Sequence, residues 1–118
     1  MSFWRKQVIE PVLDQETARH IREQAEWIAR EPSNARPYYH LAQLYRTQGR
    51  QDEALGLLLE AVNLDDAFGE AHLALTEIYV VRGDDRAAWR HARAAEQRNE
   101  RRGVELLTRY GICESTGL

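Results

Sequence analysis

Apolar residues between positions 35 and 98 recur with the period of an α-helix, in four successive stretches. In the first stretch Tyr38, Leu41 and Tyr45 take the i, i+3 and i+7 positions, which share one face of a helix. In the second stretch Ala54 and Leu58 stand four residues apart on the same predicted face. The remaining stretches predict helices over residues 68–81 and 85–98. The pattern therefore predicts two successive helix–turn–helix units.

The residues between these stretches are those that start and end helices. Ser33 or Asn34 is available as N-cap of the first helix, and Pro37 stands where a first-turn proline is tolerated. Gly49 ends that helix, because glycine adopts the left-handed C-cap conformation without a steric penalty. Gly83 marks the same turn in the second unit.

The two units align with each other without a gap when each residue i is set against residue i+34. This alignment pairs residues of similar character at the positions that pack and turn. The aligned pairs are Tyr38 with His72, Leu41 with Leu75, Ala42 with Thr76, Tyr45 with Tyr79, Gly49 with Gly83, Ala54 with Ala88, Leu58 with Ala92 and Ala61 with Ala95.

These residues resemble the tetratricopeptide repeat (TPR) family, whose unit is a helix–turn–helix with this same period. The matching positions are the large–small pair Leu41–Ala42 and more loosely Leu75–Thr76, the first-helix aromatics Tyr45 and Tyr79, the turn glycines Gly49 and Gly83, and the small second-helix residues Ala54, Ala61, Ala88 and Ala95. The closing proline of the family is replaced by Asp66 and Glu100. The resemblance covers residues 35–100. It implies an all-α fold, a short right-handed α-solenoid of TPR-like repeats with capping helices.

Two repeats leave apolar faces uncovered, so the flanking segments are expected to supply caps. We expect a single domain over residues 1–118. Upstream, Ala18, Ile21, Ala25 and Ile28 form a helical stripe that predicts a second-type helix, whose own first helix is missing or reduced to residues 3–10. Downstream, Leu106–Tyr110 echoes the first helices at a step of 31, which leaves a third unit or a simple cap open. The expected divisions are 1–34 for N-terminal capping helices, 35–68 and 69–100 for the repeats, and 101–118 for a C-terminal capping helix and tail.

The resemblance also implies where a partner would bind, because the first helices of stacked TPR units line a concave groove. An extended peptide or a helix of another protein suits such a groove, and a plain solvated face is the alternative. The expected groove residues are Tyr39, His40, Gln43 and Arg46 in the first unit and Leu73, Ala74, Glu77 and Val80 in the second. Family members that clamp the carboxyl terminus of heat-shock chaperones use lysine, asparagine and arginine there, so no carboxylate clamp is expected here.

The N-terminal segment is too apolar for a loose tail. Phe3, Trp4, Val8 and Ile9 fall within its first nine residues. Three uses compete: a cap folded over the first repeat, a contact between two copies, or a helix at a membrane surface. Only two basic residues accompany the segment, so we favour capping first and a homodimer second.

Composition and charge argue against several classes of function and indicate no catalytic or metal-binding site. The net charge of −3 gives no general attraction to nucleic acid, although Arg82, Arg86, Arg90 and Arg93 are spaced as a basic ridge. The four histidines include no i, i+3 or i, i+4 pair, and the single cysteine forms no intramolecular disulfide, so neither a metal site nor a cofactor is expected. No phosphate-binding loop or nucleophile motif is present. No apolar run is long enough to span a membrane, and a soluble cytoplasmic protein is the default.

The sequence thus predicts a non-enzymatic adaptor or scaffold that holds a peptide or helix of another protein. The alternative is a self-assembly module that joins copies through the aromatic N-terminus or the exposed repeat ends. Nucleic-acid and membrane partners are not expected.

Overall fold

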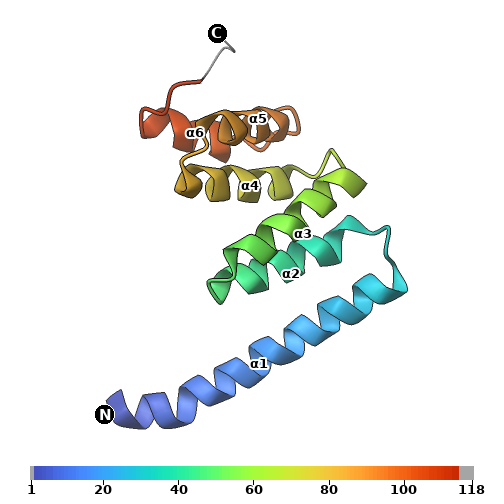
Figure 1. Ribbon diagram of the computed structural model, residues 1–118, viewed down its shortest axis with the longest axis vertical. Coiled ribbons are helices and arrows are strands. Elements are labelled where there is room, and N and C mark those ends of the chain that lie inside the picture. Colours follow the sequence, from blue (N-terminus) through green and yellow to red (C-terminus); the bar gives the residue numbers. More distant parts are fainter. Residues whose placement is uncertain (1, 115–118) are drawn as a thin grey trace.

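The fold is taken from a computed structural model, which describes the backbone of residues 2–114 and the side chains of residues 14–114. Over this part of the chain the molecule consists of six α-helices without a strand. They are α1 (Ser2–Arg30), α2 (Ala35–Thr47), α3 (Gln51–Leu64), α4 (Gly69–Arg82), α5 (Asp85–Glu96) and α6 (Arg102–Arg109). The helices are stacked in chain order along the long axis, with α1 at one end and α5 and α6 at the other (Figure 1). The all-α prediction is confirmed.

The ends of the central helices lie where the capping residues predict. The Asn34 side chain accepts a hydrogen bond from the backbone nitrogen of Arg36 at 3.0 Å, which identifies Asn34 as the N-cap of α2. Gly49 has φ of 76° and Gly83 φ of 79°, so both turn glycines adopt the left-handed conformation that favours glycine. Asp84 then caps α5 by accepting from the backbone nitrogen of Ala87 at 3.1 Å.

Small residues bring the two helices of each unit together. The helix pairs α2–α3 and α4–α5 contact most extensively, and α3 also packs on α4. Leu58 and Leu75 are fully buried between them. Alanines fill the closest approaches, because a methyl group keeps neighbouring helix axes near each other. The fully buried alanines are Ala42, Ala54, Ala61, Ala71, Ala88, Ala92 and Ala95.

The C-terminal helix α6 takes the place of a first helix in a third unit. It packs on α5 and more lightly on α4, as α4 packs on α3. Leu107 is fully buried against α5. A Cβ atom on Gly103 would lie 3.3 Å from the Ala92 Cβ, so glycine lets α6 approach α5 closely. The indole nitrogen of Trp89 donates to the carbonyl of Ile112 at 3.0 Å and fixes the segment that follows α6.

The N-terminal region differs from the prediction of more than one capping helix. Ser2–Arg30 is one continuous helix of 29 residues that passes through Pro11. Residues 12–30 contain neither glycine nor proline, so Pro11 alone does not end the helix. The continuous helix is also about 24 Å longer than α2 at about 1.5 Å per residue, so its N-terminal half extends past α2 instead of folding back over the first repeat (Figure 1). The side chains of Phe3, Trp4, Val8 and Ile9 lie outside the described residues, and their contacts stay a prediction.

Candidate functional site

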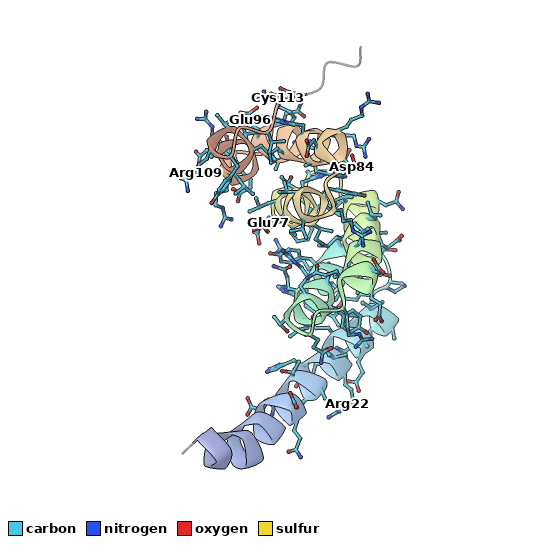
Figure 2. The ribbon with its side chains drawn as sticks, turned by 60° about the vertical axis from the view of Figure 1, so that its left-hand side comes forward. Arg22, Glu77, Asp84, Glu96, Arg109 and Cys113 are labelled. Atoms are coloured by element: carbon cyan, nitrogen blue, oxygen red, sulfur yellow. The ribbon has the colours of Figure 1, made fainter. Side chains whose placement is uncertain are left out.

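The candidate site lies on the inner side of a bend in the stack of helices. Figure 2 shows α1 and α6 leaning toward the same side of the molecule, with Glu77 of α4 on the inner side of the bend. The first helices of the two repeats, α2 and α4, supply the residues expected there. We call this surface, formed by Tyr39, Gln43, Arg46, Leu73, Glu77 and Val80, the concave face.

A chain of polar contacts crosses the concave face from α2 to α4. The Gln43 amide nitrogen donates to the Tyr39 hydroxyl at 3.4 Å. Arg46 donates to the amide oxygen of Gln43 at 3.1 Å and to the Glu77 carboxylate at 3.4 Å. Burial, followed by the negative charge of Glu70, raises the pKa of Tyr39, so its hydroxyl keeps its proton at neutral pH. The face therefore presents a neutral phenol beside a half-exposed ion pair.

Apolar side chains complete the concave face on α4. Leu73 and Val80 are both half-buried. They are the i+34 counterparts of Tyr39 and Arg46, so they take the same places in the second unit. Seven residues on a helix span about 10.5 Å at about 1.5 Å per residue. The face therefore offers two apolar contacts separated by about two helical turns.

Two of the predicted groove residues lie elsewhere. Ala74 is only 2% exposed and belongs to the core formed by α2, α3 and α4, so the prediction that it contacts a partner is wrong. Its position is one residue, or about 100°, around the helix from Leu73, which is enough to turn it inward. His40 is exposed but faces α1, where its ring stacks with that of Trp27 at 6.4 Å between centroids.

The helix α6 carries a residue whose charge is influenced by the concave face. Hydrogen bonding to Glu100 raises the pKa of Arg102, and the charge of Glu77 adds to this effect. Arg102 itself pairs with Glu100 at 2.7 Å. The echo of the first helices at Leu106–Tyr110 was the available signal, but its step of 31 left the register of α6 undefined.

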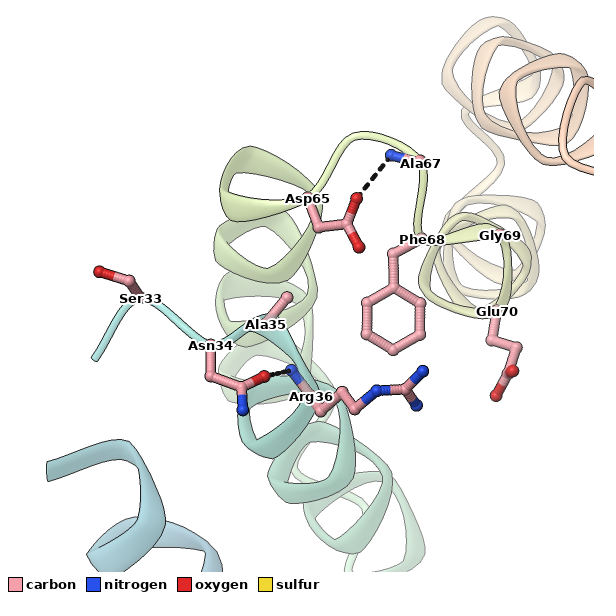
Figure 3. A pocket seen from close by; sticks show the side chains of 9 residues that line it. All are labelled: Ser33, Asn34, Ala35, Arg36, Asp65, Ala67, Phe68, Gly69 and Glu70. Carbon is pink, nitrogen blue, oxygen red and sulfur yellow. Dashed lines mark hydrogen bonds between the residues drawn. The ribbon is translucent and has the colours of Figure 1, made fainter. Parts of the chain in front are cut away.

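A hollow of about 410 Å³ lies where the N-termini of α2 and α4 meet (Figure 3). Arg36 lies over the Phe68 ring, 5.6 Å from its centroid. Asp65 accepts from the backbone nitrogen of Ala67 at 3.0 Å, so it caps the turn. Glu70 adds a second carboxylate to the lining. The negative charge of these carboxylates disfavours binding of an anion at the helix N-termini. We therefore interpret the hollow as a structural feature of the α3–α4 turn.

The predicted basic ridge is interrupted by ion pairs. Arg82 pairs with Asp52 of α3. Arg93 pairs with Glu96 at 3.0 Å and with Glu114 at 2.7 Å, and its guanidinium lies over the ring of Trp89. Half of the ridge is therefore used to hold helices and the C-terminal segment in place.

Histidines form a buried pair between α4 and α5. The Nδ1 atoms of His72 and His91 are 3.0 Å apart, and His72 Nε2 lies 3.0 Å from the Asp66 carbonyl oxygen. Because a carbonyl only accepts, His72 Nε2 carries the hydrogen and His91 Nδ1 donates to His72 Nδ1. Within residues 14–114 no three histidine, cysteine or acidic side chains are grouped to hold a metal ion. We therefore interpret the pair as a packing contact.

A family model described as tetratricopeptide repeat matches residues 14–97, which is more than half of the chain. The chain belongs to the tetratricopeptide repeat family. TPR repeats generally mediate protein–protein interactions, and the family is generally a non-catalytic interaction module. The match begins within α1, so the C-terminal half of α1 belongs to the repeat array of this TPR protein. No curated protein sequence matches the chain. Among the helices described, none is long and apolar enough to cross a membrane.

Proposed function

We propose that this TPR protein is a non-enzymatic adaptor that holds a segment of another protein against its concave face. The observation that carries the proposal is the partial exposure of Leu73 and Val80 beside the Arg46–Glu77 ion pair. Large apolar side chains that remain partly exposed next to a polar rim are typical of protein contact sites.

The spacing on the face limits the segment that fits. Two apolar side chains about 10 Å apart match Leu73 and Val80, which corresponds to i and i+7 on an α-helix or to i and i+3 on an extended polyproline II segment, whose period is about three residues. A charged residue between them can bind either half of the Arg46–Glu77 pair. Tyr39 offers an aromatic surface and a hydroxyl at the α2 end. An amphipathic helix or an extended peptide with this pattern is the expected ligand.

Adjacent valines give a matched test of this assignment. Val80 belongs to the concave face, whereas Val81 is 86% exposed and points elsewhere on the same helix. A photo-crosslinking residue at position 80, and not at position 81, should attach to one defined segment of a partner. A synthetic peptide of that segment should then bind at least ten-fold more weakly to Val80→Asp than to Val81→Asp, because burying an unpaired carboxylate at the contact is costly. Equal binding to both variants would refute the concave face as the binding site.

A further inference from the structure

The groove between α1 and α2 repeats a surface found in the middle of the molecule. This groove encloses about 490 Å³ and is lined by His20, Gln24, Trp27, His40, Gln43, Leu44 and Thr47. Setting each of these residues against its i+34 counterpart gives Ala54, Leu58 and Ala61 on α3 and Ala74, Glu77, Ile78 and Val81 on α4. All seven lining residues therefore have counterparts on the next pair of helices.

Most of these counterparts belong to the core in which α2 packs, and Val81 is the exposed exception. Ala54, Leu58 and Ala61 are fully buried in the core shared with α2, and Arg46 of α2 pairs with Glu77 of α4. The second helix of one unit and the first helix of the next unit thus form a groove that holds the first helix of the earlier unit, as α3 and α4 hold α2. We call the groove between α1 and α2 the N-terminal seat, because it has the same place in the repeat.

In the N-terminal seat no helix of residues 2–114 takes the position of α2. His40 is exposed where its counterpart Ala74 is buried, and Leu44 is half-buried where its counterpart Ile78 is 3% exposed. The acceptor oxygen of Gln24 is shielded from solvent and has no hydrogen-bond partner among the described residues. The seat is therefore amphipathic, with an apolar centre at Trp27.

The other end of the molecule presents the matching element. The helix α6 has the position of a first helix, and no second helix of the described residues covers its outer side. Tyr110 at its end is 69% exposed, whereas the first-helix aromatics Tyr45 and Tyr79 are half-buried. The described helices thus begin with a second-type helix, α1, and end with a first-type helix, α6.

Geometry and charge direct α6 toward another copy. The two helices lie at opposite ends of the molecule (Figure 1), whose longest extent is 54 Å, so α6 does not reach the N-terminal seat of its own chain. Residues 101–109 carry three arginines against one glutamate, whereas residues 14–31 carry five acidic residues against three arginines. The α1 side of the N-terminal seat therefore attracts α6, whereas α2 adds Arg36 and Arg46 without an acidic residue.

We propose that α6 of one copy docks in the N-terminal seat of a second copy, so that α6 and the partner's α1 complete one helix–turn–helix unit across the contact. The repeat interfaces at α3–α4 and α5–α6 then continue from one molecule into the next. The contact is head-to-tail, and such contacts build open chains unless the rotation closes a ring. His20 and Trp27 are larger than their counterparts Ala54 and Ala61, which keeps the helices further apart than within the chain, so the contact is expected to be weaker than the repeat interfaces of one molecule.

The full chain is tested by sedimentation velocity over a concentration series. The mass should rise with concentration beyond that of two copies. Tyr110→Glu places a negative charge against the acidic α1, and His40→Arg places a positive charge against the basic α6. Each variant should weaken self-association at least ten-fold, whereas the exposed control Val81→Glu should not. Circular dichroism checks that the variants keep their helices.

Mixing the two variants separates this contact from a symmetric one. Tyr110→Glu keeps an intact N-terminal seat and His40→Arg keeps an intact α6, so an equal mixture should form a complex at concentrations where neither variant associates alone. A chain that stays monomeric at every concentration, variants that associate like the original chain, or a mixture that stays monomeric would each overturn the proposal. The binding test at Val80 is independent of these outcomes, because neither variant changes the apolar contacts of the concave face.

Discussion

Acid should destabilise the molecule through His91. The ring is 8% exposed, stacks on Tyr79 with a centroid distance of 5.6 Å, and donates to His72. Burial, followed by the electrostatic influence of His72 and then of Arg90, lowers the pKa of His91 from 6.5 to about 4. His91 therefore stays neutral in the folded molecule at pH values where an unfolded chain binds a proton.

The sign and size of the effect follow from this difference. Above pH 6.5 both states are neutral at His91, so its contribution to stability is fully present. As the pH falls from 6.5 toward 4, the unfolded state gains a proton that the folded state does not bind, and the free energy of unfolding decreases. The slope is about 1.4 kcal/mol per pH unit for one group, so the loss between about pH 7.5 and about pH 5 is on the order of 2 kcal/mol.

Urea unfolding at about pH 7.5 and about pH 5, followed by circular dichroism, measures this loss. His91→Gln removes the titrating group and keeps a polar side chain beside His72, so it should lose about 2 kcal/mol less than the original chain over the same interval. His20→Gln is the matched control, because the side chain of His20 is exposed, so this variant should keep the full loss. The same pH dependence in the original chain and in His91→Gln would refute the reasoning.

Glycine and leucine pairs test the packing. Gly83→Ala should lower the free energy of unfolding by about 1 kcal/mol, because φ is positive there, whereas Gly56→Ala inside α3, with no atom within 4 Å, should raise it by roughly 0.5–1 kcal/mol. Leu58→Ala should cost about 2–5 kcal/mol, and Leu59→Ala, at a side chain 39% exposed, should cost clearly less; equal losses would contradict the assignment of α3's buried face. Gly103→Val should loosen α6 and expose its amides to hydrogen exchange, since the new side chain meets α5; unchanged protection of α6 would argue against the close approach.

The central repeats could be predicted from the sequence because local and long-range signals agree there. Gly49 and Gly83 mark both turns, and the buried alanines fall at the spacing that the repeat requires. The N-terminal helix was harder to predict, because Pro11 is a helix-breaking signal that the surrounding good helix formers outweigh.

The concave face was predicted only in part, and the reason differs from that at the N-terminal helix. The helical period separates inner from outer positions only to within about one residue, so Ala74 was placed beside Leu73 although it turns into the core. The influence of the concave face on Arg102 was not predicted, because so short a helix after a change in repeat length gives too few apolar positions to fix its register.

The stacking of each helix on its nearest neighbours in the sequence also bears on how the chain folds. The helix pairs in extensive contact are consecutive along the chain. The pair α4 and α6, which is not consecutive, has a smaller contact. Contacts of this kind close only short loops, so the search for the native state is brief and the folding rate is expected to be high for the chain length. Unfolding, in turn, can begin at α6 and α1, which have neighbours on one side, and spread inward to α3 and α4. The molecule is therefore expected to unfold progressively from its two ends, so that the backbone amides of the terminal helices exchange their hydrogens long before those of the central helices.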